Sequence, residues 1–464
     1  MISFSSIDII IILFFFASIL FIGFYAGRKT ESDANDYLLS GRKVGLFLFV
    51  LTNVSTWYGG ILGVGEFTYR YGIVSWFTQG LPYYIFAFLF AIFFAKKIRK
   101  ASLFTIPDKL TEVYGKKVGL LSAVVVFVLV SPAPYLLMTA GLLTLLFDIS
   151  IFPALIISVI LSMAYLLKGG FRANIYADAL QFFVMFAGFI LIVIFSADNF
   201  GTIEFISSAV PANHIKLSGG MSPMFIIVWF LIALWTFADP GFHQRCYAAK
   251  SGNVAVKGII ISIFFWALFD FLTTTTGLFS KAVIPNLDNP VLAFPLLAEK
   301  VLPSGVKGIF YAALFATILS TLNSFLFLSG TTIGRDFIFR INPKHDETKL
   351  KYYTIIGLMI SGILAIVLAL LIPSVIEIWY TIGSLFIPAI ILPVVSAYYP
   401  KIRIENKFVL IEMISAITLS SIWIFIRSNF DTVPIINELE PMIVGMVVAF
   451  LIHFFSLAFR AYKI

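Results

Sequence analysis

The candidate functional residues of this 464-residue chain are polar side chains inside long apolar runs. Four of them carry hydroxyl groups and recur at i, i+3, i+4 and i+7, on one face of a helix: Thr317, Ser320, Thr321 and Ser324. A single hydroxyl in a membrane helix usually bonds back to its own helix or packs at a helix contact. Four on one face instead predict a surface of neutral oxygens. Together with carbonyl oxygens and a carboxylate, such oxygens are the ligands of a small hard cation.

Asp178 is the carboxylate predicted to complete this surface. Asn174, Asp178 and Gln181 lie at i, i+4 and i+7 and form one polar face of an otherwise apolar run. Because a charged group inside a membrane segment is costly, its default interpretation is functional. Asp178 could serve a second cation or the release path of the first. Alternatively, it could carry the proton of a proton-coupled permease.

Two apolar runs contain a predicted break in the helix, and only a broken helix has main-chain carbonyl groups free to bind an ion. One break is at the pair Gly59-Gly60, and the other is at Asp239-Pro240-Gly241, where proline removes a backbone donor. The two breaks lie five runs apart. This spacing is expected of two inverted five-helix repeats with a binding site between them.

The composition of the chain indicates that these polar residues lie in membrane spans. Apolar residues make up 60% of the chain and charged residues 12%, with a mean hydropathy of +1.01, whereas a soluble domain has about 25% charged residues. We therefore predict an all-α membrane protein with thirteen transmembrane helices. The apolar runs are roughly 7–27, 45–68, 73–95, 118–147, 151–167, 173–196, 223–241, 257–279, 306–330, 352–372, 375–398, 408–426 and 441–459.

The basic residues predict the orientation of these spans. Most of the 32 Lys and Arg residues fall in alternate loops. Because such loops face the cytoplasm, we predict that the amino terminus lies outside the cell and the carboxyl terminus lies inside it. Their distribution as loop residues also argues against nucleic acid as a partner. A single cysteine, Cys246, and four scattered histidines give neither a disulfide nor a zinc site, and the chain has no phosphate-binding loop for ATP.

Four stretches of the chain, taken in order, resemble the sodium/solute symporter family, which includes sodium/galactose, sodium/proline, pantothenate, iodide and sialic acid carriers. They are residues 53–72, from Asn-Val-Ser to Tyr-Arg-Tyr-Gly; 105–108, Thr-Ile-Pro-Asp; 168–181, from Lys-Gly-Gly to Ala-Asp-Ala-Leu-Gln; and 244–250 followed by Ser320-Thr321 and Asp336. The resemblance covers roughly residues 10–400.

The resemblance implies a leucine-transporter-like fold in which an inverted five-helix repeat forms the core on spans two to eleven. The whole of residues 1–464 would then be one polytopic transport domain. Its first repeat would span about 45–196 and its second about 223–398, with 7–27, 408–426 and 441–459 as peripheral spans.

The resemblance also implies the residues of the binding sites. A main sodium site would use the carbonyl groups of Leu51, Val54 and Thr317 and the side chains of Ser320 and Thr321. A second sodium ion or its release path would involve Asp178, Asn323 and Ser324, although Asn323 replaces the serine of members with two ions. The positions that match substrate residues are Tyr58, Gln79, Asp239 and Trp266. Sugar carriers of the family have glutamine at the first of these positions and lysine at the last, so the chain resembles them poorly there.

We expect sodium-coupled symport of a small organic solute by alternating access, with no covalent chemistry and with Na⁺ as the only cofactor. No Lys or Arg is counted deep in a core span, which disfavours strong anions as solutes. An ammonium group could instead meet Asp239 or Asp270, with cation–π contact from Tyr58, Trp235 or Trp266. An amino acid or another amine-bearing solute is therefore favoured, unless Asp239 only caps its helix.

Other solutes and other functions stay open at this point. A sodium symporter for a sugar, a vitamin or a monocarboxylate is one alternative, and a proton-coupled permease is another. An intramembrane aspartyl protease would need a Gly-x-Gly-Asp signature, which the chain lacks. The expected partners are the solute, sodium and the lipid bilayer, and the expected functional unit is a monomer.

Overall fold

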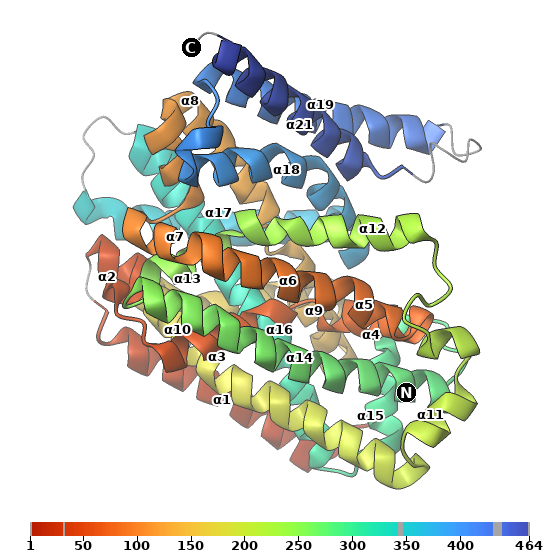
Figure 1. The fold of residues 1–464 in the computed structure, drawn as a ribbon. Helices are drawn as coiled ribbons and strands as arrows, with labels where there is room; N and C mark the ends of the chain where they lie inside the picture. The colour runs from red at the N-terminus through yellow and green to blue at the C-terminus, as the bar shows by residue number, and fades with distance from the viewer. Residues whose placement is uncertain (1, 31–32, 342–346, 430–438, 463–464) are drawn as a thin grey trace.

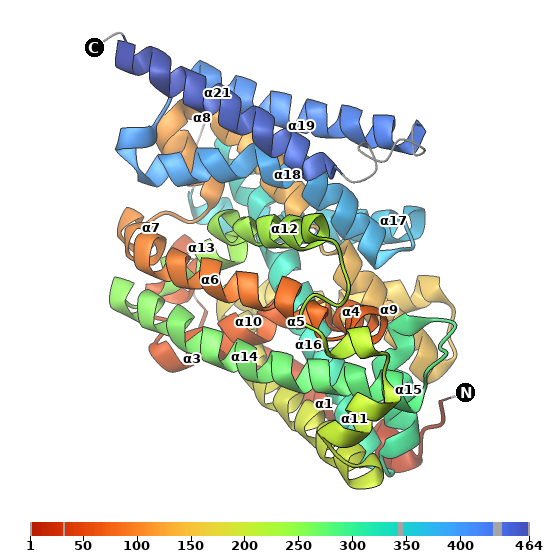
Figure 2. The same cartoon turned by 45° about the vertical axis from the view of Figure 1, so that its right-hand side comes forward.

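The computed structural model describes residues 2–30, 33–341, 347–429 and 439–462 (Figures 1 and 2). Regular elements within these ranges are helices, where η marks a 3₁₀ or π helix. The first half holds α1 (Ser6–Gly27), α2 (Ala34–Leu39), η1 (Ser40–Arg42), α3 (Leu46–Ser55), η2 (Thr56–Tyr58), α4 (Ile61–Tyr71), α5 (Val74–Gln79), α6 (Leu81–Phe90), η3 (Ala91–Ala95), α7 (Lys96–Ala101), α8 (Ile106–Leu129), α9 (Ala133–Phe147), α10 (Ile151–Phe200), α11 (Ile203–Ala209) and η4 (Ala212–Ile215).

The second half continues in the same way. It holds α12 (Pro223–Ile232), η5 (Ala233–Ala238), α13 (Pro240–Ala248), α14 (Gly252–Val283), η6 (Pro290–Leu292), α15 (Ala293–Val301), α16 (Val306–Thr331), η7 (Thr332–Phe339), η8 (Glu347–Lys349), α17 (Leu350–Leu371), α18 (Val375–Tyr398), η9 (Pro400–Ile402), α19 (Asn406–Asn429) and α21 (Pro441–Tyr462). These elements confirm the all-helical prediction for the described residues.

Eleven described helices are long and apolar enough to cross a membrane, or twelve when the bent pair Leu46–Tyr58 and Ile61–Tyr71 is added as one span. The difference from the thirteen predicted spans arises in α10, whose 50 residues contain two predicted runs. A straight helix of that length would measure about 75 Å, more than twice the hydrocarbon thickness of about 30 Å. The number of spans, the inverted repeat and the orientation stay predictions.

Gly170 interrupts α10 between these two predicted runs. Its backbone has φ 53° and ψ −142°, outside the helical region, and a Cβ atom there would lie 2.3 Å from the carbonyl oxygen of Tyr37. Only glycine tolerates both conditions. Tyr37 also donates a hydrogen bond of 3.0 Å to the Leu166 carbonyl, which fixes α2 against the bend.

The predicted break in the second span is confirmed. Helix α3 ends at Ser55, η2 follows, and α4 departs at 57° from the first part of the span. A Cβ atom on Gly59 would lie 2.3 Å from Cβ of Thr321, and one on Gly60 would lie 2.4 Å from the ring of Trp379. The glycine pair is therefore required by close approach of neighbouring helices.

The predicted break in the seventh span is also confirmed, but the span continues further than predicted. Helix α12 passes into the 3₁₀ helix η5, Asp239 is extended at φ −67° and ψ 116°, and a new helix begins at Pro240. Proline is favourable at a first helical position, because the backbone donor it lacks is unpaired there anyway. The predicted end at residue 241 is wrong, since α13 runs to Ala248.

Helix α16 is the most enclosed of the candidate spans. In the most apolar window of Val306–Phe339, 89% of the residues are buried, against 28–50% in the other described candidates. It packs against α10, α1, α3 and η2. By contrast, α19 and α21 lie side by side at one edge of the molecule, beyond α18 (Figures 1 and 2). The helix with the predicted hydroxyl stripe is therefore an interior helix.

Candidate functional site

A cluster of buried polar side chains surrounds Asp178 where α3, η2, α10 and α16 meet. Ser320 donates a hydrogen bond of 2.7 Å to Oδ1 of Asp178, and Thr52 donates to Oδ2. Thr56 lies 3.4 Å from the same Oδ2 atom. We call the following set the hydroxyl cluster: Thr52, Ser55, Thr56, Asn174, Asp178, Ser320 and Ser324.

Further hydrogen bonds tie the cluster together across the three helices. Ser320 Oγ lies 3.1 Å from Ser55 Oγ and 3.2 Å from Thr56 Oγ1, which joins α16 to the second span. Asn174 donates to Ser324 Oγ over 2.8 Å, which joins α10 to α16. The predicted association of the stripe, the carboxylate and the broken second span is therefore present in the structure.

Arg245 on α13 inserts a positive charge into this cluster. Its Nη2 atom lies 2.6 Å from Thr56 Oγ1, 3.0 Å from Thr52 Oγ1 and 3.3 Å from Ser324 Oγ. It also lies 3.7 Å from Oδ2 of Asp178, and the side chain is only 2% exposed. A buried carboxylate needs such a partner, because its charge is costly away from water.

Arg245 overturns the expectation that no Lys or Arg lies deep in a core span. The error follows from ending the seventh run at residue 241, since the guanidinium group belongs to the continuation of that span after Pro240. The signal available in the sequence was the preference of proline for the first turn of a helix.

Hydroxyl residues of the second span were also missed as candidate ligands. Thr52, Ser55 and Thr56 are not among the residues predicted for either ion site. In the structure their hydroxyl groups face Asp178 and Ser320. Their spacing of three and four residues, the same as in the stripe, was the signal that could have found them.

The residues predicted for the main sodium site have different surroundings in the structure. Leu51 and Val54 are buried on α3, and Thr321 donates a hydrogen bond of 2.7 Å to the Thr56 carbonyl. Thr317 donates back to the carbonyl groups of its own helix, at 2.7 Å and 3.1 Å, whereas Ser320 binds Asp178. The five-residue sodium site itself stays a prediction.

Asn323, predicted near the second ion, points elsewhere. Its side-chain amide donates to the hydroxyl group of Tyr165 on α10. None of the hydrogen bonds found among the described residues joins it to the hydroxyl cluster. Ser324 takes part in the cluster, so the two neighbouring candidates have separate surroundings.

A cavity of about 180 Å³ adjoins the hydroxyl cluster. We call it the solute cavity, and its described lining is Asn53, Thr56, Trp57, Tyr83, Tyr135, Trp235, Asp239, Gly241, Phe242, Arg245, Thr321, Phe325 and Leu328. Six of these residues are aromatic, and Asp239 and Arg245 carry opposite charges. Thr56 belongs to the hydroxyl cluster as well, and Arg245 donates hydrogen bonds to the cluster, so the cluster and the cavity adjoin at these two side chains.

Asp239 lines the cavity and also caps α13. Its Oδ1 atom accepts a hydrogen bond of 2.8 Å from the backbone N–H of Phe242, so the capping role considered from the sequence is present. A carboxylate has further acceptor sites on its second oxygen. Asp239 can therefore hold its helix and still contact a solute.

Four predicted substrate residues lie outside the described lining of the solute cavity. Tyr58 donates to the Trp266 carbonyl over 2.8 Å, and the Trp266 ring packs behind Trp57 with ring centres 5.1 Å apart. Asp270 accepts a hydrogen bond from Tyr84. Gln79 ends α5 and is half-buried. Of the predicted set, Trp235 and Asp239 are the ones brought to the cavity.

Relatives of the chain are carriers of several small solutes. It is 25% identical over 399 residues to the high-affinity choline transporter 1 of Drosophila melanogaster, covering 80% of this chain but only 63% of that relative. It is 28% identical over 369 residues to the sodium/pantothenate symporter of Escherichia coli, covering 75% and 76%. It is 24% identical over 381 residues to the sodium/proline symporter of Staphylococcus aureus, covering 77% and 73%.

Solved transporters share the fold. A Na⁺-coupled sialic acid symporter in a substrate-bound, outward-open state superposes with a TM-score of 0.83 at 16% identity, covering 98% of each chain. A nucleobase-cation-symport-1 family transporter superposes with a TM-score of 0.56 at 14% identity, covering 92% of this chain and 95% of that one.

A family model described as the sodium:solute symporter family matches residues 37–414. This match confirms the resemblance found in the sequence, and with it the predictions of a multi-pass plasma-membrane protein and of Na⁺ as the coupling ion. The chain belongs to the sodium:solute symporter family.

Proposed function

We propose that this protein couples the entry of Na⁺ to the uptake of a small amine-bearing solute, an amino acid or a related compound, by alternating access. The observation that carries the proposal is the shared wall between the ion ligands and the cavity. Thr56 belongs to both the hydroxyl cluster and the solute cavity, and Arg245 lines the cavity and bonds to the cluster. Thr321 lies between the cavity and the second span.

Sodium would act on the helices that meet at the cluster. Oxygen ligands from α3, α10 and α16 would bind the ion together, so the ion favours the arrangement in which these helices are close. A ligand shifts a conformational equilibrium only through its different affinity for the two states. Arg245 already bonds to the same oxygens, so an ion entering the cluster would displace or reorient its guanidinium group at the wall of the cavity.

The solute class follows from the charges and rings of the cavity. The Asp239 carboxylate and the surrounding aromatic faces suit an ammonium group, and the Arg245 guanidinium suits a carboxylate. An amino acid carries both groups. Buried donor atoms on two lining residues, Nδ2 of Asn53 and Nε of Arg245, have no hydrogen-bond partner among the described residues. A solute carboxylate would satisfy them.

A monocarboxylate without an amine is the second candidate, and Arg245 is the observation that favours it. The relatives include carriers named for choline, proline and pantothenate, which do not decide between the classes. Proton coupling through Asp178 is the competing ion mechanism.

The proposal is tested by solute uptake into proteoliposomes under an inward Na⁺ gradient, with L-proline, choline, pantothenate and galactose as probes. We expect L-proline or choline to accumulate. Asp239→Asn should then raise the half-saturating concentration of that solute about tenfold or more. Asp270→Asn is the matched control, because Tyr84 binds that carboxylate outside the cavity, and it should change the value less than about twofold.

Accumulation of galactose or pantothenate alone would contradict the amine-bearing class. An unchanged half-saturating concentration in the Asp239→Asn variant would contradict the role of the cavity. Neither result by itself removes sodium-coupled transport.

A further inference from the structure

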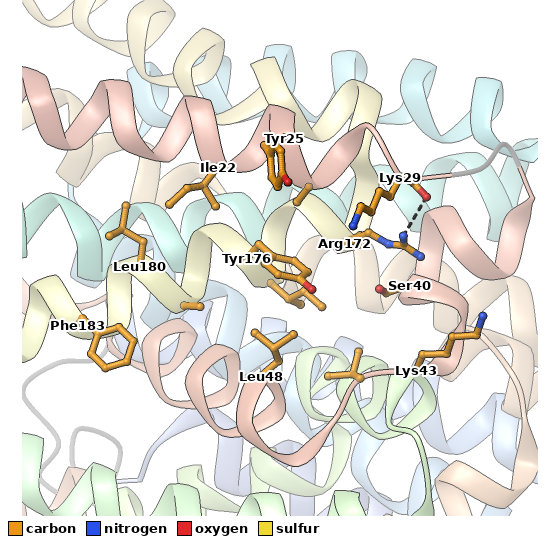
Figure 3. Close-up of a pocket in the computed structure, with 14 residues that line it drawn as sticks. Ile22, Tyr25, Lys29, Ser40, Lys43, Leu48, Arg172, Tyr176, Leu180 and Phe183 are labelled. Atoms are coloured by element: carbon orange, nitrogen blue, oxygen red, sulfur yellow. Dashed lines mark hydrogen bonds between the residues drawn. The ribbon is translucent and has the colours of Figure 1, made fainter.

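A second and larger cavity lies away from the site described above. It has a volume of about 610 Å³ and is formed by the end of α1, the part of α10 after Gly170, and the segment from η1 to the start of α3 (Figure 3). Its size is within the range of about 300–1,000 Å³ typical of ligand pockets. We call it the α1–α10 groove.

The two ends of the groove differ in chemistry. Figure 3 shows Lys29, Lys43 and Arg172 together with Ser40 at one end. The other end is apolar and is walled by Ile22, Leu180 and Phe183. Tyr25 and Tyr176 lie between the two ends, as tyrosine side chains do at the boundary of a bilayer.

The basic end carries more positive charge than its protein partners neutralise. Arg172 pairs with Asp36 and donates a hydrogen bond of 2.9 Å to the Lys29 carbonyl. The side chains of Lys29 and Lys43 are exposed, and no ion pair or hydrogen bond of their amino groups is found among the described residues. Two cations are therefore available to an anionic group at the mouth of the groove.

We propose that the α1–α10 groove binds one anionic phospholipid, with its phosphate between Lys29 and Lys43 and an acyl chain along Ile22 and Phe183. Basic pockets between transmembrane helices on the cytoplasmic side suit the headgroups of anionic lipids. The groove lies at the end of the helices that the sequence predicts to be cytoplasmic. A soluble phosphate would use the basic end but would leave the apolar walls without a partner.

This inference goes beyond the proposed function, but the groove lies next to the hydroxyl cluster. Ala179 lines the groove, while the adjacent Asp178 lies in the hydroxyl cluster. Leu48 lines it as well, four residues before Thr52 on α3. A bound lipid would therefore contact α3 and α10, two of the elements that hold the cluster.

Native mass spectrometry of the purified full chain in detergent tests the proposal, with phosphatidylglycerol and phosphatidylcholine of equal chain length as probes. We expect phosphatidylglycerol to bind about tenfold more tightly. Lys29→Gln combined with Lys43→Gln should remove most of this preference. The matched control is Lys116→Gln with Lys117→Gln, which changes two exposed lysines on α8 and should leave the preference intact.

A second variant tests the apolar end of the groove. Ala179→Trp should fill the space beside Leu180 and weaken phosphatidylglycerol binding about tenfold, while glycerol 3-phosphate at the same concentration should not compete. Equal binding of the two lipids, competition by glycerol 3-phosphate, or an unchanged preference in the double lysine variant would overturn the proposal.

Discussion

The two broken spans of this protein differ in how they are broken and in what they present. In the second span the break is a glycine pair that lets Thr321 and Trp379 approach the backbone closely. In the seventh span the break is an extended aspartate before a proline, and the aspartate caps the helix that follows. The span with the first break carries hydroxyl groups of the hydroxyl cluster, and the second break brings a carboxylate to the solute cavity.

In the proposed mechanism the two breaks have separable roles joined by one side chain. Arg245 follows the second break in the sequence. Its side chain donates hydrogen bonds to the hydroxyl groups of Thr52 and Thr56, which precede the first break. Changes near the first break should therefore alter the response to sodium, and changes near the second should alter the response to solute. Changes to Arg245 should alter both.

The largest effect is expected from Arg245→Gln, which breaks the link between the two regions. It leaves Asp178 buried without its cation, and removing one partner of a buried ion pair destabilises a protein by about 3 kcal/mol or more. We expect a clear fall in the thermal unfolding temperature of the purified protein and loss of solute uptake. A variant with wild-type stability and uptake would show that the cluster does not depend on this charge.

The next effect is expected in the sodium response alone. Ser320→Ala combined with Thr321→Ala should raise the sodium concentration for half-maximal uptake about tenfold, equivalent to about 1.4 kcal/mol. Thr317→Val is a matched control, because the Thr317 hydroxyl bonds only to its own helix among the described residues and its carbonyl group is retained. An unchanged sodium dependence in the correctly inserted double variant would remove these hydroxyl groups from the site.

Asp178→Asn sharpens the question of stoichiometry. If the cluster binds a second sodium ion, this variant should lower the Hill coefficient for sodium from about two to about one, measured from initial uptake rates. A coefficient of about one in the unchanged protein would instead assign Asp178 to the release path of a single ion.

The smallest effect is expected beyond the first break, on α4. Arg70 pairs with Glu66 over 2.9 Å, but its side chain is 48% exposed. The Glu66 side chain is only 10% exposed, but its partner reaches water, so we expect about the 0.2–0.5 kcal/mol of an i, i+4 surface pair. Arg70→Gln should therefore change the thermal unfolding temperature very little, which makes it a control for Arg245→Gln. A large loss of stability or uptake would indicate a role for this pair in gating.

Much of the fold was predictable because apolar runs and helix breakers act locally. Both broken spans were found from glycine and proline, and the stripe of α16 was found from its spacing. The path of α13 was not, because treating Pro240 as an end rather than a start hid Arg245. The placing of Asp270 beside Tyr84 was also unpredictable, since it depends on contact between α6 and α14 that no local pattern encodes.

Sodium coupling through the hydroxyl cluster is tested most directly by comparing driving forces in one preparation. Proteoliposomes should accumulate the best solute of the uptake screen under an inward Na⁺ gradient at equal internal and external pH. An inward proton gradient in sodium-free medium should give no accumulation, and the Ser320→Ala, Thr321→Ala variant should need more sodium for the same rate. Accumulation driven by the proton gradient without sodium would contradict the account and assign the coupling to protonation of Asp178.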